Sequence, residues 1–102
     1  MNYTPIKDFD HYVINKYGII VDLRNKQDLI IQNNTVILEK DNIDHSFPLT
    51  QLIYETFHGS LNPDEYITFI DNNPHNLHYK NLSKSKTYYS YFNNLLNILS
   101  ML

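Results

Sequence analysis

The sequence predicts an α+β fold from three changes of pattern along the chain. The first forty residues alternate β-branched apolar segments with turn residues, which is typical of short antiparallel strands. "FPLTQLIYETFHG", residues 47–59, has the spacing of an amphipathic helix. The last third returns to a strand and then to a second helical pattern. We therefore expect a small antiparallel sheet plus a helix, followed by a ββα unit with a C-terminal helix.

The predicted sheet is an antiparallel β meander over residues 1–47. Gly18, in the segment Asn15-Lys16-Tyr17-Gly18, supplies the positive φ that a tight hairpin turn needs. The dipeptide Asn33-Asn34 tolerates the left-handed region and is expected to join a second pair of strands. The expected strands are residues 11–14, 19–23, 28–32 and 35–40.

The predicted first helix covers residues 48–59. Its apolar side chains fall at i, i+3, i+4 and i+8, which is the stripe that one helix face buries. Pro48 suits the first turn, and Gly59 suits the C-terminal cap. The stripe consists of Leu49, Leu52, Ile53 and Phe57.

Residues 64–102 complete the predicted domain. A strand at 66–70 runs into a polar loop, and residues 81–85 fit a short returning strand. From about residue 86, apolar side chains spaced 4, 3, 4 and 3 predict a helix that docks on the sheet. The other faces of this helix are also apolar, so we keep a homodimer through it as an alternative. The spaced side chains are Tyr88, Phe92, Leu95, Leu99 and Leu102.

Composition limits the class of protein. A chain of 102 residues suits a single domain, residues 1–102. It contains no cysteine, which excludes disulfides and thiolate metal sites. No apolar stretch approaches the ~20 residues of a membrane helix, so we expect no membrane partner and an intracellular location.

Charge is distributed unevenly along the chain. Residues 1–71 hold five basic and eleven acidic residues, whereas residues 72–102 hold three lysines and no acidic residue. Phosphate binding needs Lys and Arg to displace counterions. Any nucleic-acid contact is therefore expected in the last third, at Lys80, Lys84 and Lys86.

Three segments resemble, in the same order, parts of the phage-type HNH (His-Me finger) homing endonucleases. "FDHYVINKYGIIVDL", residues 9–23, resembles the small-sheet module that precedes the nuclease unit. Residues 47–59 resemble the helix that follows it. "ITFIDNNPHNLHYKNL", residues 67–82, resembles the HNH motif itself. The resemblance covers nearly the whole chain and implies the same fold.

The resemblance also implies a metal-dependent nuclease site, but the residues at that site differ. In this family a tandem histidine pair supplies a metal ligand and the general base, and these positions fall on Thr68 and Phe69. A further metal ligand falls on Ser90, with Asn93 one turn later, while Asn81 matches the residue that holds the loop. A benzene ring accepts no proton, and a neutral alcohol is a weak ligand. We therefore expect a degenerate nuclease with no catalytic residue, no metal and no cofactor, and hence no enzyme.

Three functions follow, in this order. The first is a catalytically inactive binding protein, phage or virus encoded, that inhibits or modulates a nucleic-acid-processing protein of the host or of a competitor. The second is a non-catalytic DNA-binding protein that uses segment 80–86. The third is a metal-dependent nuclease with a shifted site near Asp71, His75 and His78. In the first function the protein target contacts Tyr88, Tyr89, Tyr91, Leu95 and Leu99.

Overall fold

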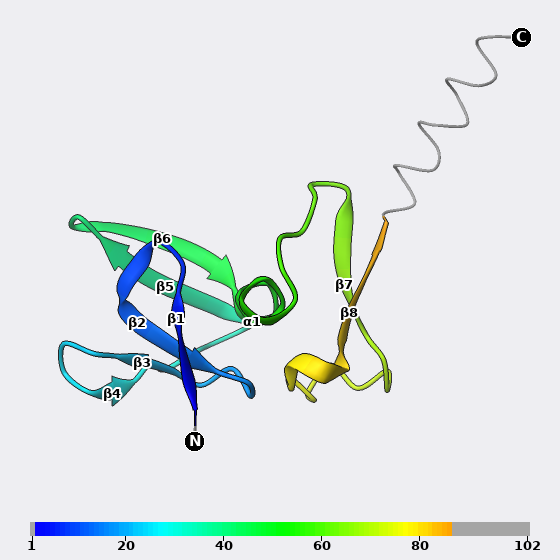
Figure 1. The fold of residues 1–102 in the computed structure, drawn as a ribbon, viewed down its shortest axis with the longest axis horizontal. Coiled ribbons are helices and arrows are strands. Elements are labelled where there is room, and N and C mark those ends of the chain that lie inside the picture. Colours follow the sequence, from blue (N-terminus) through cyan, green and yellow to red (C-terminus); the bar gives the residue numbers. More distant parts are fainter. Residues whose placement is uncertain (1, 87–102) are drawn as a thin grey trace, which may run out of the picture.

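The computed structural model describes residues 2–86. They form small antiparallel sheets and one α-helix, as the α+β prediction requires (Figure 1). Strands β1 to β4 make one sheet in sequence order, β5 pairs with β6, and β7 pairs with β8. Helix α1 lies between the two N-terminal sheets and the β7–β8 hairpin (Figure 1). The elements are β1 (Tyr3–Ile6), β2 (Phe9–Asn15), β3 (Ile20–Asp22), β4 (Gln27–Asp28), β5 (Thr35–Lys40), β6 (Ile43–Pro48), α1 (Leu49–Phe57), β7 (Glu65–Phe69), the 3-10 turn η1 (Tyr79–Asn81) and β8 (Leu82–Lys86).

The predicted C-terminal helix lies outside the described residues, together with every side chain assigned to a protein partner or a homodimer. The predicted division of the chain into 1–47, 48–59 and 64–102 stays a prediction. Within residues 2–86, no helix is long and apolar enough to cross a bilayer.

The turn between β2 and β3 has the geometry that its sequence predicts. Asn15 is fully buried, and its side-chain Oδ1 accepts hydrogen bonds from the backbone N–H groups of Tyr17 (2.9 Å) and Ile19 (3.0 Å). Gly18 has a φ of +86°, and a Cβ there would lie 2.7 Å from Cδ1 of Ile53 on α1. Only glycine fits, because it tolerates this φ and lets the helix approach the turn.

The predicted pairing of residues 28–32 with 35–40 is wrong. A single bridge, Gln32 to Thr35, forms there, and β5 pairs instead with β6. The turn between β5 and β6 is Asp41-Asn42, with φ values of +54° and +63°, the double positive φ that favours a two-residue hairpin. The sequence of β6 shows no clear apolar alternation, because three of its six residues are polar and none of the six is buried.

Helix α1 takes part of its N-terminal cap from a distant turn. Pro48 at the N-cap makes no side-chain hydrogen bond. Instead, the backbone O of Asn34 accepts from the N–H of Leu49 (2.8 Å), and its Oδ1 accepts from the N–H of Thr50 (3.1 Å). Asn33 and Asn34 both have positive φ, as their sequence predicts. The turn therefore satisfies two of the N–H groups that a helix start leaves without partners.

The buried core lies mainly between the N-terminal sheets and α1. Ile14, Ile20, Leu38 and Ile53 are fully buried there. They come from β2, β3, β5 and α1, so the predicted helical stripe does face a core. Within residues 2–86, every buried side-chain nitrogen and oxygen has a hydrogen-bond partner.

Arg24, the only arginine of the chain, is committed to a structural network. Its Nη2 donates to Asp22 Oδ2 (2.9 Å) and to the hydroxyl of Tyr12 (2.8 Å), and its Nη1 donates to Glu39 (3.3 Å). The Tyr12 hydroxyl also accepts from the backbone N–H of Glu39 (3.0 Å). The network thus joins the first sheet to the β5–β6 hairpin. The hydrogen bond from Arg24 lowers the pKa of Asp22 below its ordinary value.

Candidate nucleic-acid interface

Strand β7 carries positions 68 and 69, where the resemblance places the family's histidine pair, and β8 is its partner strand. They pair antiparallel, with Phe69 opposite Leu82 and Thr68 opposite Ser83. Because successive side chains of a strand point to opposite faces, Thr68 and Phe69 face opposite sides of this hairpin. The residues at the two family positions therefore do not converge on one point.

Asp71 and Asn81 close the loop between the strands. Asn81, nearly buried, accepts from the Asp71 N–H (3.0 Å) and donates to Asp71 Oδ1 (2.9 Å) and to the carbonyl of Asn76 (2.9 Å). The Asp71 carboxylate also accepts from the Asn73 N–H (2.8 Å) and from Nδ2 of Asn76 (2.9 Å). These hydrogen bonds lower the pKa of Asp71 and so keep its carboxylate ionised. The bond from Asn76 has the largest effect. Both carboxylate oxygens are used within the loop.

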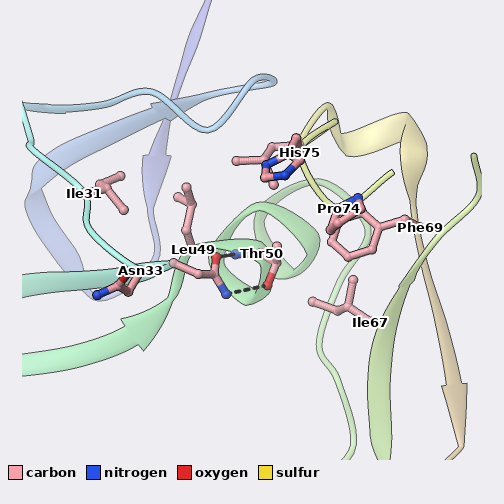
Figure 2. Close-up of a pocket in the computed structure, with 10 residues that line it drawn as sticks. Ile31, Asn33, Leu49, Thr50, Ile67, Phe69, Pro74 and His75 are labelled. Atoms are coloured by element: carbon pink, nitrogen blue, oxygen red, sulfur yellow. Dashed lines mark hydrogen bonds between the residues drawn. The ribbon is translucent and has the colours of Figure 1, made fainter. Parts of the chain in front are cut away.

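A cavity of about 770 Å³ separates this hairpin from the N-terminal part (Figure 2). Ile67 and Phe69 line it from β7, and His75 lines it from the loop. On the other side lie Leu49 and Thr50 at the start of α1, beside the capping turn (Figure 2). The cavity is mostly apolar, with an imidazole at one edge.

The divalent cation that the resemblance implies finds no fitting donor set. Thr68 and Phe69 face apart, and the carboxylate of Asp71 already accepts three hydrogen bonds from nearby residues, two at Oδ1 and one at Oδ2. Over residues 2–86, no group of three or more His, Asp or Glu side chains is arranged to hold a metal ion. Ser90 and Asn93 lie outside the described residues. The side chains of residues 2–86 therefore do not by themselves make up the ligand set that the resemblance implies.

The histidines of the loop make separate local contacts. The backbone N–H of His75 donates to Asn73 Oδ1 (3.0 Å). Nδ1 of His78 accepts from the N–H of Lys80 (3.2 Å) and caps η1. His78 does not line the cavity that His75 lines. The two side chains therefore do not form the joint site that their spacing suggested.

The three predicted DNA-contacting lysines differ in their surroundings. Nζ of Lys84 lies 3.2 Å from Oε2 of Glu65, so an acidic partner offsets its charge. Glu65 is ionised in turn, because the Asn62 N–H and then Lys84 lower its pKa. Lys80 on η1 and Lys86 at the end of β8 are exposed. Of the three, only Lys84 is in an ion pair within residues 2–86.

The fold also brings in a residue that sequence reasoning missed. The backbone O of Lys16, in the β2–β3 turn, accepts from the N–H of Tyr79 (3.0 Å), and its Nζ lies 5.5 Å from the centre of the Tyr79 ring. The β2–β3 turn, which carries Lys16, therefore lies next to η1, which carries Lys80 (Figure 1). No local signal predicts this contact, because it depends on how distant segments dock.

Comparison with known proteins was made at three levels. No protein-family model matches the chain, and no curated protein matches it. A solved structure described as "DNA binding and cleavage by the HNH homing endonuclease I-HmuI" matches with a TM-score of 0.75 at 20% sequence identity. The match covers 99% of this chain and 59% of that one. This chain has an HNH-endonuclease-like fold.

The comparison corrects one expectation. We expected no enzyme because Thr68 and Phe69 replace a histidine pair. The finding contradicts that expectation, because the matching structure with this fold is described as a DNA-cleaving endonuclease. Two differing side chains do not by themselves demonstrate a loss of activity.

Proposed function

We propose that this chain binds DNA through the surface formed by η1 and β8. The observation that carries the proposal is the fold match over 99% of the chain to a structure described as DNA-binding and DNA-cleaving. Charge supports the same surface. Residues 72–86 contain three lysines and no acidic residue, whereas all eleven acidic residues precede them.

The contribution of each cation differs in this proposal. Arg24 is held by Asp22 and Glu39, so it is not available to phosphates. Lys84 must leave Glu65 before it can bind a phosphate fully. Lys80 and Lys86 have no such partner to leave among the ion pairs of residues 2–86. They are the main phosphate contacts in this proposal.

A salt titration tests this function. Fluorescence anisotropy with a labelled duplex gives Kd at several salt concentrations, and each phosphate contact adds about 0.9 to the slope of log Kd against log salt. We expect Lys80→Gln with Lys86→Gln to lower the slope by about 1 to 2. Lys7→Gln with Lys40→Gln, two exposed lysines of the N-terminal sheets, is the matched control. Absence of DNA binding, or equal slopes in both variants, would contradict the proposal.

A nuclease with a shifted site is the second candidate, and one observation favours it. His75 lines the same cavity as Phe69, so an imidazole lies near the position of the family's histidine. An imidazole can take a proton from water at neutral pH. Plasmid nicking in Mg²⁺ or Mn²⁺ tests the idea, with His75→Ala compared with His11→Ala, an exposed histidine of β2. Nicking that His75→Ala leaves unchanged would exclude His75.

The protein-directed role ranked first from the sequence stays a prediction. Its contact residues lie beyond residue 86, and phage or viral origin and inhibition of a host protein rest on the resemblance alone. DNA binding now precedes it, because the fold match and the charge of residues 72–86 both support a nucleic-acid partner.

A further inference from the structure

One exposed patch joins two segments that are far apart in the sequence. It consists of Lys16 and Tyr17 from the β2–β3 turn and of His78, Tyr79 and Lys80 around η1; we call it the junction patch. The rings of Tyr17 and His78 lie 4.8 Å apart at an interplanar angle of 75°. The hydrogen bond from Tyr79 to the Lys16 carbonyl fixes the two segments side by side (Figure 1).

Tyr17 offers an open aromatic surface at this patch. Its side chain is 58% exposed, although its neighbours in the turn hold the backbone firmly. The T-shaped contact with His78 uses one edge or one face of a ring, so a large part of the Tyr17 ring remains accessible. A rigid, exposed tyrosine gives contact area at a low entropy cost.

The Tyr79 ring is held in place from several sides. Phe57 lies 5.2 Å and His58 5.4 Å from it between ring centres, and Nε2 of His58 donates to the Tyr79 carbonyl (2.7 Å). Lys16 lies over the same ring. The Tyr79 ring therefore fixes the position of Lys16, and Lys80 follows Tyr79 directly in the chain.

Charge indicates which ligand fits. The segments that form the junction patch, residues 15–19 and 78–81, hold two lysines and no acidic residue. An accessible ring flanked by cations is the arrangement that binds unpaired nucleotides, with a base on the ring and phosphates on the lysines. Bases inside a duplex are stacked on each other and cannot reach such a ring.

We propose that the junction patch binds a single-stranded or unpaired DNA nucleotide, whose base stacks on Tyr17 and whose flanking phosphates contact Lys16 and Lys80. This inference rests on the DNA binding proposed above, since Lys80 belongs to both surfaces. It adds a substrate preference that neither the fold match nor the sequence contains.

A stacking-sensitive probe tests the inference with the full chain. A 12-nucleotide single strand with 2-aminopurine reports stacking by fluorescence, and anisotropy gives its Kd. Loss of the stacking of one base on an aromatic side chain corresponds to about a 5- to 160-fold increase in Kd. We expect Tyr17→Ala to weaken single-strand binding by that factor and to abolish the fluorescence change, and Tyr17→Phe to preserve both.

Two further variants complete the experiment. Tyr3→Ala removes another exposed tyrosine, on β1, and should leave Kd unchanged. Lys16→Gln should lower the salt slope for the single strand by about 0.7. Thermal melts show whether each variant is folded. If Tyr17→Ala unfolds, Tyr17→Phe keeps the test decisive because it keeps the ring: a folded Tyr17→Phe variant that loses single-strand binding or the fluorescence change would exclude stacking on this ring.

The outcomes separate the two proposals. Wild-type DNA binding that neither Tyr17→Ala nor Lys16→Gln alters would overturn the junction patch and leave the proposed function standing. Equal weakening of a fully paired duplex and of the single strand by Tyr17→Ala would also overturn it. Failure of the wild-type chain to bind any DNA would overturn both.

Discussion

The N-terminal part and the β7–β8 hairpin are held together by different forces. Ten of the eleven buried apolar side chains described in residues 2–86 precede residue 55, and Leu82 alone belongs to the hairpin unit. In that unit, hydrogen bonds between Asp71 and Asn81 hold the loop between the strands in place. The buried apolar core therefore lies almost entirely in the N-terminal part, whereas the β7–β8 unit depends more on hydrogen bonds. Apolar burial fixes the scaffold, and hydrogen bonds shape the loop that borders the cavity and η1.

Removing the centre of the apolar core should have the largest effect. Ile53→Ala deletes a fully buried side chain that contacts Gly18, and we expect a loss of about 2 to 5 kcal/mol in the free energy of unfolding. Urea denaturation measures it. Ile37→Ala, at a position that is 58% exposed on β5, is the control and should change stability by less than about 0.5 kcal/mol. Equal losses in the two variants would refute this account of the core.

Breaking the polar pair should affect the hairpin locally. Asn81→Ala leaves the Asp71 N–H and the Asn76 carbonyl without their side-chain partner, and an unsatisfied buried group costs about 1 to 3 kcal/mol. Hydrogen exchange should show lost protection in residues 70–78 and unchanged protection in β2 and β3. Asn25→Ala, which removes an exposed turn hydrogen bond, is the control. Uniform loss of protection along the chain would show that the two regions are not separate.

Substitution of Arg24 tests whether a polar network also contributes to the stability of the N-terminal part. Arg24→Met keeps an aliphatic side chain but removes the guanidinium that lies over the Tyr12 ring and donates to Asp22 and Glu39, so we expect a loss of stability smaller than that of Asn81→Ala. The control is Lys26→Met, at an exposed position beside it. Thermal or urea unfolding at pH 7 gives both values, and a neutral Arg24→Met would mean that packing alone joins the two sheets.

Lowering the pH should have the smallest effect on the free energy of unfolding. The pKa of Asp22 is lower in the folded protein than its ordinary value near 3.8. Its contribution is therefore fully present above pH 3.8 and is lost as pH falls through the lower folded pKa. Asp71 shifts in the same direction. The stability difference between the wild type and Asp22→Asn should thus shrink below pH 3.8 in urea titrations, and a difference that grows there would refute the assignment.

Local patterns in the sequence were enough for the parts that depend on neighbours along the chain. The Asn15–Gly18 turn and the stripe of α1 follow from backbone geometry and helical periodicity, and both are present. Pairing of β5 with β6 was missed because the turn Asp41-Asn42 competes with an equally plausible turn at Asn33-Asn34.

Only part of the candidate nucleic-acid interface could be predicted, because local patterns in the sequence do not show contacts between distant segments. Lysines 80, 84 and 86 stand out in the sequence, but the ion pair of Lys84 with Glu65 depends on strand register. Likewise, the contact of Lys16 with Tyr79 depends on docking between distant segments. The expectation that the chain is no enzyme rested on the two differing side chains at 68 and 69, and the fold match contradicts it.

The close approach of Gly18 to α1 has a consequence for evolution. Because the helix fixes the path of the turn, Tyr17 keeps its position without help from any ligand. Selection can therefore exchange the exposed side chain at position 17 while the architecture beneath it stays constant. Position 18 itself has no such freedom, so a mutational scan should find a tolerant residue directly beside an invariant one.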